Sequence, residues 1–559
     1  MVKTPTIHGR ILLTHQLFPS IYIPENSEYV AVTDHMWLTD DLPYNKITLL
    51  HRFLSATVYA KQNGYERFWI GEYARPFRSV CKHFRSVGIR HVKMFDPLDI
   101  PLRRSIEQLC RLERITVEFE DSPAFNETHE DLNIFLKENP PKKQGGIRKY
   151  NHGTFYRWQR NRLGLLLTDD GKPLGGRWTY DTENREPFPS TVSRDPTLLV
   201  DTSPKEPSTS FSLKQYSNIT LTEINDIVEY IRKHHKSNPG NIPDYSPKQI
   251  LTYMSNMYPI TRSQALKRLK LFMKLTLEDF GPYEDAFRPG ITYGHHSVLS
   301  SSLNNGLITP DDVISDIYKY ETKLSSIKSR LNTETYKQRL SSLEGFTRQI
   351  IGWRSYVRLV YREERNVMMR SNFLRHRKML SRYWFTNNTI PTTHIDWLDT
   401  LLQDAYDKGY AHHIVRLMVF SNWFLLNGYH PRQVLKWYSS VVSIDAYEWV
   451  MVPNVLGMGQ FADGGVMMQR PYISASSYLK KMSNNTVSSE PVELTINGHK
   501  EMIEWDKIWD AMYYNFLMKH ETKLGKMYAY SRSYAYMRRV NESTRRNWRT
   551  IATAYQRIL

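Results

Sequence analysis

The hydrophobic pattern of this chain changes its period once, and this change constrains the fold more than any other feature of the sequence. Between residues 10 and 130, short apolar runs alternate with amphipathic segments. From about residue 216 onward, apolar residues recur at helical spacing and strand-like alternation disappears. The chain therefore predicts two unlike domains, an α/β domain followed by a large all-helical domain.

The first domain has the pattern of a doubly wound parallel sheet. Its helices alternate with its strands, and those at Ile47–Asn63 and Ala74–Val87 are followed by glycine, the residue that often ends a helix. Sheets of this kind bind nucleotide-like ligands beyond the carboxyl ends of their strands. The expected strands are Arg10–Leu13, Tyr29–Val32, Arg67–Ile70, His91–Phe95 and Ile115–Phe119.

A segment that cannot form a core separates the two domains. Residues 186–215 contain five Pro and ten Ser or Thr, which is typical of a linker, and residues 145–168 are basic and aromatic with no acidic residue. We therefore predict an α/β domain at 1–135, a basic segment and linker at 136–215, and a helical domain at 216–559. The predicted helices of the last are Leu221–Lys233, Arg262–Leu277, Leu343–Tyr361, Leu398–Tyr406, His412–Leu426, Pro431–Ser440 and Glu501–His520.

The composition limits the function classes. Lys and Arg number 75 against 57 Asp and Glu, so the net charge of +18 favours a polyanionic partner such as nucleic acid or a membrane surface. The only cysteines, Cys81 and Cys110, exclude a disulfide framework and a metal site built from four thiolates of this chain. No apolar run approaches 18 residues, and the N-terminus lacks an apolar signal core. We expect a soluble intracellular protein.

Two segments of the helical domain carry polar residues suited to a phosphate-bearing ligand, although neither a Walker A run nor a strand followed by GxGxxG is present. Four Ser and two Asn lie within Ser297–Asn305, where they fit either a diphosphate cradle or a Ser-rich turn that caps a helix. The stretch Gly345–Arg358 fits either a ligand-binding helix or an ordinary core helix. Its polar and aromatic residues within about one turn of each other are Arg348, Gln349, Trp353 and Arg354.

Two further segments carry potential proton-transfer and ion-pair groups. His412 and His413 are adjacent and lie one turn before Arg416, a spacing that does not suit a helical zinc site and that also fits a structural histidine pair. Glycines interrupt the helical pattern at 457–465, which favours either a backbone close to a ligand or a long loop. Asp445 precedes them as a potential buried anion opposite Arg416.

The C-terminal tail is strongly basic. Lys523–Leu559 contains nine Lys or Arg and one acidic residue, Glu542, with aromatic residues between them. This pattern fits a solvated helix face as well as a surface that contacts phosphates.

Taken together, these segments resemble the photolyase/cryptochrome superfamily, and within it the photolyase-related branch that includes the iron–sulfur bacterial cryptochromes and photolyases. They occur in the family's order and span nearly the whole chain. The segments are GGRWTYDTENR (175–185), ALKRLKLFMKLTLEDFGPYEDAF (265–287), HSVLSSSLNNGLITP (296–310), EGFTRQIIGWRSYVR (344–358), YAHHIVRLM (410–418) and DAYEWVMVPNVLGMGQFADGGVMMQRPYISASSYLKKMS (445–483).

The resemblance implies an N-terminal antenna domain and a helical domain that holds a U-shaped FAD. It assigns the flavin phosphates to the Ser/Asn stretch and an ion pair between Arg416 and Asp445 to the side of the isoalloxazine, where charges tune the flavin. His413 falls where this branch places its lesion-contacting histidine, with His412 beside it. The implied FAD-binding residues are Tyr283, Ser297, Ser300, Asn304, Arg348, Gln349, Trp353, Arg416 and Asp445.

The sequence departs from the family at several positions. The cluster cysteines are missing, with Thr393 near the first of them, so we expect no iron–sulfur cluster and no other metal. Phe385 replaces a surface tryptophan that relays electrons in relatives, which leaves Trp437, Tyr438 and Trp384 as the expected electron-transfer residues. An antenna chromophore of the lumazine type is an expectation from the family alone.

The resemblance implies a light-dependent repair enzyme whose excited, reduced FAD passes an electron to UV-damaged DNA. The branch and the histidine pair favour the (6-4) photoproduct as the lesion. A cyclobutane dimer photolyase, a signalling cryptochrome and a basic nucleic-acid-binding protein with a vestigial flavin fold remain alternatives. We expect the protein to act as a monomer.

Overall fold

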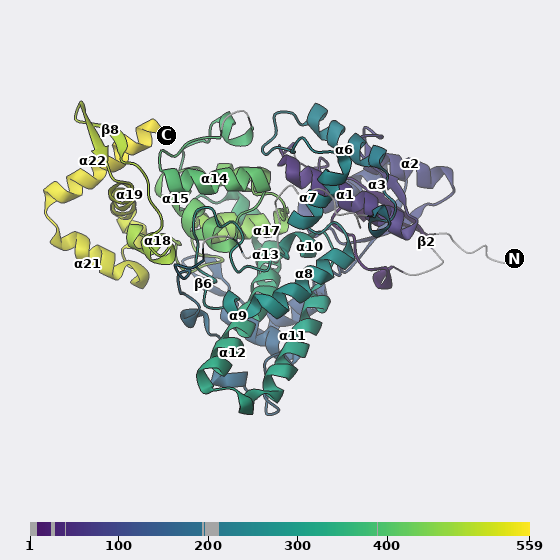
Figure 1. Ribbon diagram of the computed structural model, residues 1–559, viewed down its shortest axis with the longest axis horizontal. Helices are drawn as coiled ribbons and strands as arrows, with labels where there is room; N and C mark the ends of the chain where they lie inside the picture. Colours follow the sequence, from purple (N-terminus) through teal and green to yellow (C-terminus); the bar gives the residue numbers. More distant parts are fainter. Residues whose placement is uncertain (1–7, 24–27, 40, 193–194, 196–211, 388–389) are drawn as a thin grey trace.

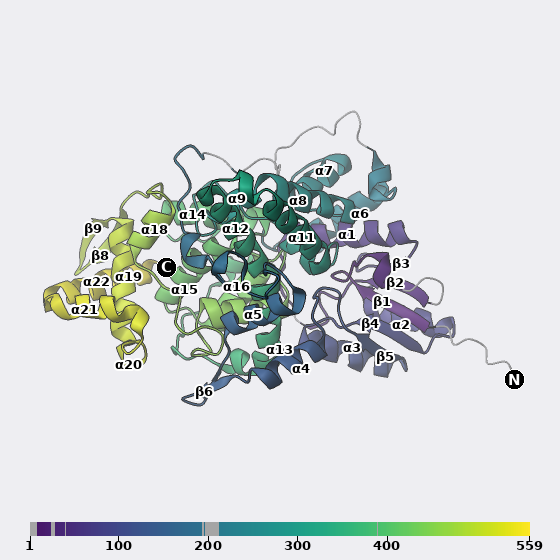
Figure 2. The same ribbon diagram turned by 90° about the horizontal axis from the view of Figure 1, so that it is seen from below.

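The structure is a computed structural model that describes residues 8–23, 28–39, 41–192, 195, 212–387 and 390–559. The α/β domain lies at one end, the helices from α6 to α17 fill the middle, and a small C-terminal unit lies at the other end (Figures 1 and 2). Most of the linker predicted at 186–215 lies outside the described residues.

The α/β domain is built on a five-stranded parallel sheet of order β3-β2-β1-β4-β5. The expected strands are therefore confirmed, with ends that shift by one or two residues. The strands are β1 (His8–Leu13), β2 (Glu28–Thr33), β3 (Glu66–Phe68), β4 (His91–Phe95) and β5 (Thr116–Glu120).

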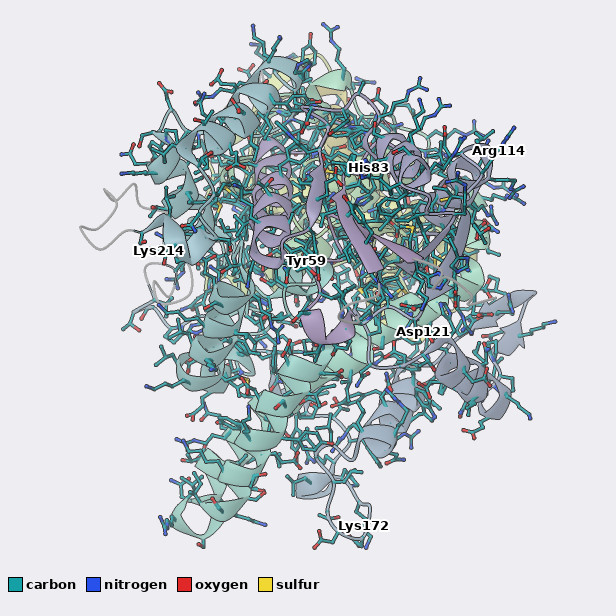
Figure 3. The ribbon with its side chains drawn as sticks, turned by 90° about the vertical axis from the view of Figure 1, so that its right-hand side faces the viewer. Tyr59, His83, Arg114, Asp121, Lys172 and Lys214 are labelled. Atoms are coloured by element: carbon teal, nitrogen blue, oxygen red, sulfur yellow. The ribbon has the colours of Figure 1, made fainter. Side chains whose placement is uncertain are left out.

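Alternate side chains of the central strands pack on opposite faces of this sheet. Ile11 and Leu13 belong to the core that α2 (Pro76–Ser86) and α3 (Ile100–Leu112) complete, whereas Leu12 belongs to the core of α1 (Lys46–Asn63). Figure 3 shows the domain from its outer end, where the labelled residues Tyr59 and His83 identify α1 and α2. The carboxyl ends of the strands point toward the helical part.

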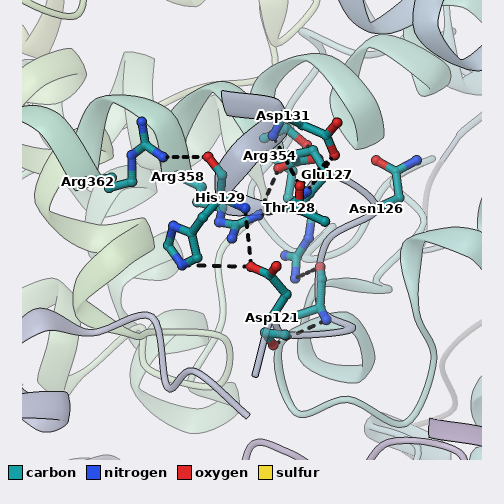
Figure 4. Close-up of polar contacts among 12 residues, drawn as sticks. Asp121, Asn126, Glu127, Thr128, His129, Asp131, Arg354, Arg358 and Arg362 are labelled. Carbon is teal, nitrogen blue, oxygen red and sulfur yellow. Dashed lines mark hydrogen bonds and ion pairs between the residues drawn. The ribbon is translucent and has the colours of Figure 1, made fainter. Parts of the chain in front are cut away.

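Arginines of a single helix attach the loop after β5 to the helical part (Figure 4). Arg358 donates to the Glu127 carbonyl at 2.6 Å. Arg362 donates to the His129 carbonyl at 3.1 Å, and Arg354 reaches the same loop. The helix that follows the loop is α4 (His129–Glu138), and it extends to both sides of residue 135, the predicted end of the α/β domain. The position of this domain boundary stays a prediction.

The helical part has the predicted helices, together with wide π-helical turns that the sequence did not predict. These turns cover Arg348–Arg354, Val415–Ser421 and Val452–Gly459. The α-helices are α5 (His152–Leu163), α6 (Leu221–His234), α7 (Pro247–Met257), α8 (Arg262–Leu275), α9 (Leu277–Phe280), α10 (Ser300–Asn304), α11 (Pro310–Ser326), α12 (Thr333–Thr347), α13 (Ser355–Arg370), α14 (Asp396–Lys408), α15 (Asn422–Leu426), α16 (Pro431–Ser440) and α17 (Glu448–Met451).

The C-terminal unit contains a β-hairpin where only helix was expected. Strands β8 (Val492–Ile496) and β9 (His499–Ile503) pair antiparallel around Asn497-Gly498, both at positive φ, the usual residues of a tight hairpin turn. The predicted helix Glu501–His520 therefore begins later, at Trp505. The remaining helices are α18 (Ser476–Met482), α19 (Trp505–Lys519), α20 (Glu521–Leu524), α21 (Ser531–Arg539) and α22 (Glu542–Ile558).

A second small hairpin lies in the basic segment between the domains. Strands β6 (Lys142–Gln144) and β7 (Ile147–Lys149) pair antiparallel around Gly145-Gly146. Among the described residues, no helix is long and apolar enough to cross a membrane.

Candidate cofactor and substrate site

A cavity of about 300 Å³ lies in the middle of the helical part. All three π-helical turns and the Ser/Asn stretch line it. A π-turn inserts an extra residue into a helix, which re-aims the neighbouring side chains, and such turns are frequent at functional sites. Of the residues expected to bind FAD, those at the cavity wall are Ser297, Ser300, Asn304, Gln349, Trp353, Arg416 and Asp445.

The expected ion pair is formed at this wall. Arg416 Nη2 lies 3.0 and 3.1 Å from the two carboxylate oxygens of Asp445. Burial opposes the charged guanidinium, but the Asp445 carboxylate outweighs it and raises the pKa of Arg416. Asn304 Nδ2 donates to the Asp445 backbone carbonyl at 2.7 Å, and Tyr438 donates to the Arg416 carbonyl at 2.6 Å. These bonds fix the pair against one side of the cavity.

Arg354 supplies a second cation at the cavity wall, joined through Asn304 to the residues of the ion pair. Its guanidinium donates to Asn304 and backbone carbonyls and lies 4.8 Å from the Phe125 ring centre, while its Nε has no partner among the described residues. Burial lowers the pKa of Arg354 to about 9, which reflects the cost of a buried charge without a carboxylate contact. A diphosphate between Arg354 and the hydroxyls of Ser297 and Ser300 would supply that counter-charge. The donor set therefore fits a dinucleotide such as FAD.

A second cavity, of about 480 Å³, adjoins the first. Its lining includes the guanidinium groups of Arg157, Arg185 and Arg470 and the aromatic rings of Trp178 and Tyr472, and Arg185 is paired there with Asp181 at 2.6 Å. Positive charge with flat rings suits a phosphodiester that carries unstacked bases. The residues that line both cavities, which we call the shared wall, are Glu284, Gln349, Trp353, His413, Leu417 and Met458.

The two adjacent histidines point to different environments. The His413 side chain lines both cavities. It lies deep within the protein, but its surface is exposed to the open space of these cavities. Burial, with repulsion from Arg416, lowers the pKa of His413 to about 4, so the imidazole is neutral at pH 7. His412 is buried and stacks on His296 with ring centres 4.5 Å apart. Of these two adjacent histidines, only His413 therefore lies within reach of a ligand in either cavity.

Glu284 is a member of the shared wall that sequence reasoning missed. Gln349 Nε2 donates to its carboxylate at 2.5 Å, and Arg348 lies 3.3 Å away. Burial raises the pKa of Glu284 to about 7, against the opposing attraction of Arg348. The carboxyl group can therefore gain or lose a proton near neutral pH while it holds the Gln349 amide.

The titration of Glu284 should make the stability of the protein depend on pH. Its folded-state pKa of about 7 exceeds the ordinary value of 4.5, so its contribution is complete below pH 4.5 and is lost as the pH rises through 7. Between pH 5 and 8 the wild type should lose about 2.5 kcal/mol of stability relative to the Glu284→Gln variant, whose amide does not titrate. Thermal unfolding from pH 5 to 8 measures this difference, with the exposed Glu278→Gln as control. Parallel curves for Glu284→Gln and the wild type would contradict it.

Five expected residues do not reach the first cavity. Arg348 turns to the second cavity, because it pairs with Asp181 at 3.2 Å and with Glu344 at 3.3 Å. Tyr283 packs beside His295, with ring centres 5.1 Å apart. The others are His412, Trp437 and Trp384, all buried in the core.

Aromatic side chains lead away from the first cavity in the direction of α16. Tyr438 lines the cavity, its ring centre lies 4.9 Å from that of Trp437, and Trp437 lies 6.3 Å from Trp384. Trp384 is 5% exposed and so is not itself a surface residue, but Tyr383 beside it is 51% exposed. The three expected electron-transfer residues thus form a row that leads from the cavity to Trp384, the chain neighbour of the exposed Tyr383.

The region around Thr393 is held by hydrogen bonds. Tyr555 of α22 donates to the Thr393 carbonyl at 2.6 Å and accepts from Trp423 at 3.1 Å. These bonds tie the C-terminal helix directly to the aromatic core.

No group of three or more His, Cys, Asp or Glu residues suited to a metal ion is found among the described residues.

The residues that sequence reasoning missed fall into two groups. Tyr410 lines the first cavity inside a segment that was already recognised, and Arg354 lines it as a residue named in the stretch Gly345–Arg358 but not assigned to the cofactor. Asp181 and Arg185 line the second cavity and belong to the segment GGRWTYDTENR. This segment contributed to the family resemblance, but none of its residues was assigned to the site.

Comparison with known proteins identifies the family. The family model described as deoxyribodipyrimidine photo-lyase-related protein matches residues 72–245. The chain is 30% identical over 410 residues to the (6-4) photolyase of Agrobacterium fabrum, which covers 72% of this chain and 70% of that protein. It is 37% identical over 114 residues to an uncharacterized protein of Acanthamoeba polyphaga mimivirus, covering 20% and 80% of the two chains.

Among solved structures, a bacterial class III photolyase from Agrobacterium tumefaciens aligns with 84% of this chain and 82% of its own, at 13% identity and a TM-score of 0.48. The match to the Agrobacterium fabrum protein extends over more than two thirds of both chains. On that match the chain belongs to the photolyase/cryptochrome superfamily, in its photolyase-related branch.

Proposed function

We propose that this protein is a light-driven DNA lyase that splits (6-4) pyrimidine–pyrimidone photoproducts with FAD as its cofactor. The observation that carries the proposal is His413, whose imidazole lies in the wall between a cavity suited to a dinucleotide and an outer cavity suited to unstacked bases. The similarity to a relative named as a (6-4) photolyase supports the same reaction.

The chain's own residues have distinct tasks in this reaction. FAD, when bound, would supply the light-driven one-electron chemistry of the reaction. Arg416 and Asp445 would place their charge pair beside the flavin, and Arg354 with Ser297 and Ser300 would bind its phosphates. The His413 imidazole hydrogen-bonds the lesion and moves the proton that returns a hydroxyl from one base to the other.

The outer cavity receives the damaged nucleotides after they leave the stack, which costs least where the bases are already distorted. Trp178 and Tyr472 offer rings for stacking, and Arg157 and Arg470 offer guanidinium groups for phosphates. Glu284 positions the Gln349 amide at the inner end of this cavity.

We assign the antenna chromophore, of the lumazine type expected from the family, to a third cavity of about 470 Å³ between the two domains. It lies beyond the carboxyl ends of β2 and β4, where His35 and Asp99 line it. Burial and the Glu448 carboxylate raise the pKa of Asp99 to about 8. Tyr447 lines this cavity and Asp445 lines the cofactor cavity, so a short segment separates the two cavities.

The test is illumination of the purified protein with defined (6-4) and cyclobutane substrates, followed by product analysis. We expect restored pyrimidines from the (6-4) substrate. Splitting of the cyclobutane substrate alone would replace the proposal with a cyclobutane dimer photolyase. Splitting of neither, with FAD bound, would replace it with a photoreceptor.

The purified protein should contain one FAD per chain and no iron. The donor set around the cofactor cavity motivates the first statement, and the absence of cysteine from the helical domain motivates the second. Absorption spectroscopy of the released flavin and elemental analysis for iron measure both. Iron at the stoichiometry of one cluster per chain would contradict the second statement.

A further inference from the structure

The β6–β7 hairpin is an exposed and densely basic projection that the proposed reaction does not use. Residues 142–149 read KKQGGIRK, with four basic residues and no acidic one. All three residues of β6 are exposed, and Figure 2 shows β6 at the lower edge of the molecule. Two strands alone are marginally stable in water. Repulsion among four basic side chains would lower that stability further, so their presence requires a physical explanation.

The strand register places like charges opposite each other. Lys142 pairs with Lys149, and Lys143 pairs with Arg148. Like charges directly opposite across a strand pair are destabilising. Only Arg148 has a carboxylate within ion-pair distance, Glu364 at 2.6 Å, among the described residues. The hairpin therefore carries an uncompensated positive charge that a polyanion would neutralise.

The hairpin is anchored at the rim of the second cavity. Tyr150, the residue after β7, donates to the Val466 carbonyl at 3.3 Å through its backbone and to Glu364 through its hydroxyl at 2.8 Å. Asn151 and His152, the next residues, line the second cavity. DNA whose damaged nucleotides enter that cavity would bring its flanking phosphates next to the hairpin.

We infer that the β6–β7 hairpin is an arm that binds the phosphate backbone of the DNA duplex beside the lesion. The inference rests on the proposed function, since it takes the second cavity as the lesion site. Gly145 and Gly146, at φ of +57° and +81°, form a compact tip without side chains that would hold the duplex away. The contacts are with phosphates, so they stabilise damaged and undamaged duplexes alike.

The test compares two variants that lose the same net charge. Lys142→Gln/Lys143→Gln removes the exposed charges of the hairpin, and Lys267→Gln/Lys270→Gln removes two exposed charges of α8 on the opposite side of the molecule (Figure 2). Fluorescence anisotropy measures affinity for a (6-4) duplex and for an undamaged duplex between 0.05 and 0.5 M salt, in the range where phosphate contacts dominate. The FAD content of each variant shows whether it is folded.

Loss of two phosphate contacts should reduce the slope of log affinity against log salt by about 1.8. With affinity at 1 M salt unchanged, that slope corresponds to roughly 60-fold weaker binding at 0.1 M salt. The α8 variant should bind like the wild type, and repair at saturating DNA should be unchanged in both. Equal losses in the two variants, or no loss in the hairpin variant, would overturn the inference. Wild-type protein that splits neither lesion would instead overturn the proposed function.

Discussion

Replacing His413 by alanine should reduce (6-4) repair by about 10²- to 10⁴-fold, the usual contribution of a positioned acid–base group. Splitting this lesion returns a hydroxyl from one base to the other, so a proton must move together with the electron. His413 is the histidine that lines both cavities, and its imidazole is neutral at pH 7, so a ring nitrogen can accept the proton that leaves the hydroxyl. Product analysis after illumination measures the loss.

The matched control for this prediction is His412→Ala. Its side chain is buried against His296 and reaches neither cavity, so its loss should lower thermal stability and FAD content. Repair per bound FAD should then remain close to that of the wild type. The His413→Ala protein should keep FAD and its affinity for damaged DNA. Normal repair by His413→Ala would refute the assignment and favour the cyclobutane or photoreceptor alternative.

Photoreduction of the bound flavin should slow by on the order of tenfold or more when Trp437 and Trp384 are both replaced by phenylalanine, equivalent to at least about 1.4 kcal/mol of barrier. Phenylalanine keeps the packing but lacks an indole that can be oxidised. The row from Tyr438 through Trp437 to Trp384 has ring-centre separations of 4.9 and 6.3 Å. Flavin absorbance under illumination with an external thiol reductant follows the rate.

A buried tryptophan outside the row provides the control. Trp397 packs on Trp505 and Trp509, with ring centres 5.3 and 5.8 Å away, and does not line the cofactor cavity. Trp397→Phe should photoreduce at the wild-type rate, although it removes an indole of similar burial. A double variant at Trp437 and Trp384 that keeps FAD and photoreduces normally would move the electron route elsewhere, for example to Trp423.

The sequence was sufficient for the sheet and for the positions of most helices. The strand β4 was predicted with its observed ends, because alternation between a core face and a polar face leaves a clear period of two. The helix α16 was likewise predicted as observed, from proline at its first turn and an apolar face. The turn residues Asn497-Gly498 are typical of a β-hairpin, but helices were expected throughout this domain, so the two strands were not predicted.

The site was predictable at the level of segments and less so at the level of single side chains. The π-helical turns are the physical reason, because an inserted residue changes the direction of every side chain in its turn. Arg348 and Arg354, at the two ends of one such turn, illustrate this: the first faces the outer cavity and the second the cofactor cavity. The carboxyl group of Glu284 enters the shared wall from a different part of the chain, which no local pattern reveals.

The shared wall has an evolutionary consequence. A side chain such as Met458 or Leu417 touches the space of the cofactor and the space of the substrate at once, so a substitution there cannot adapt one without disturbing the other. Lineages that change their lesion preference are therefore expected to do so through residues that border the outer cavity alone, such as Trp178, Arg185 and Tyr472. The inner wall is a constraint on divergence, and the rim is where new specificities can arise.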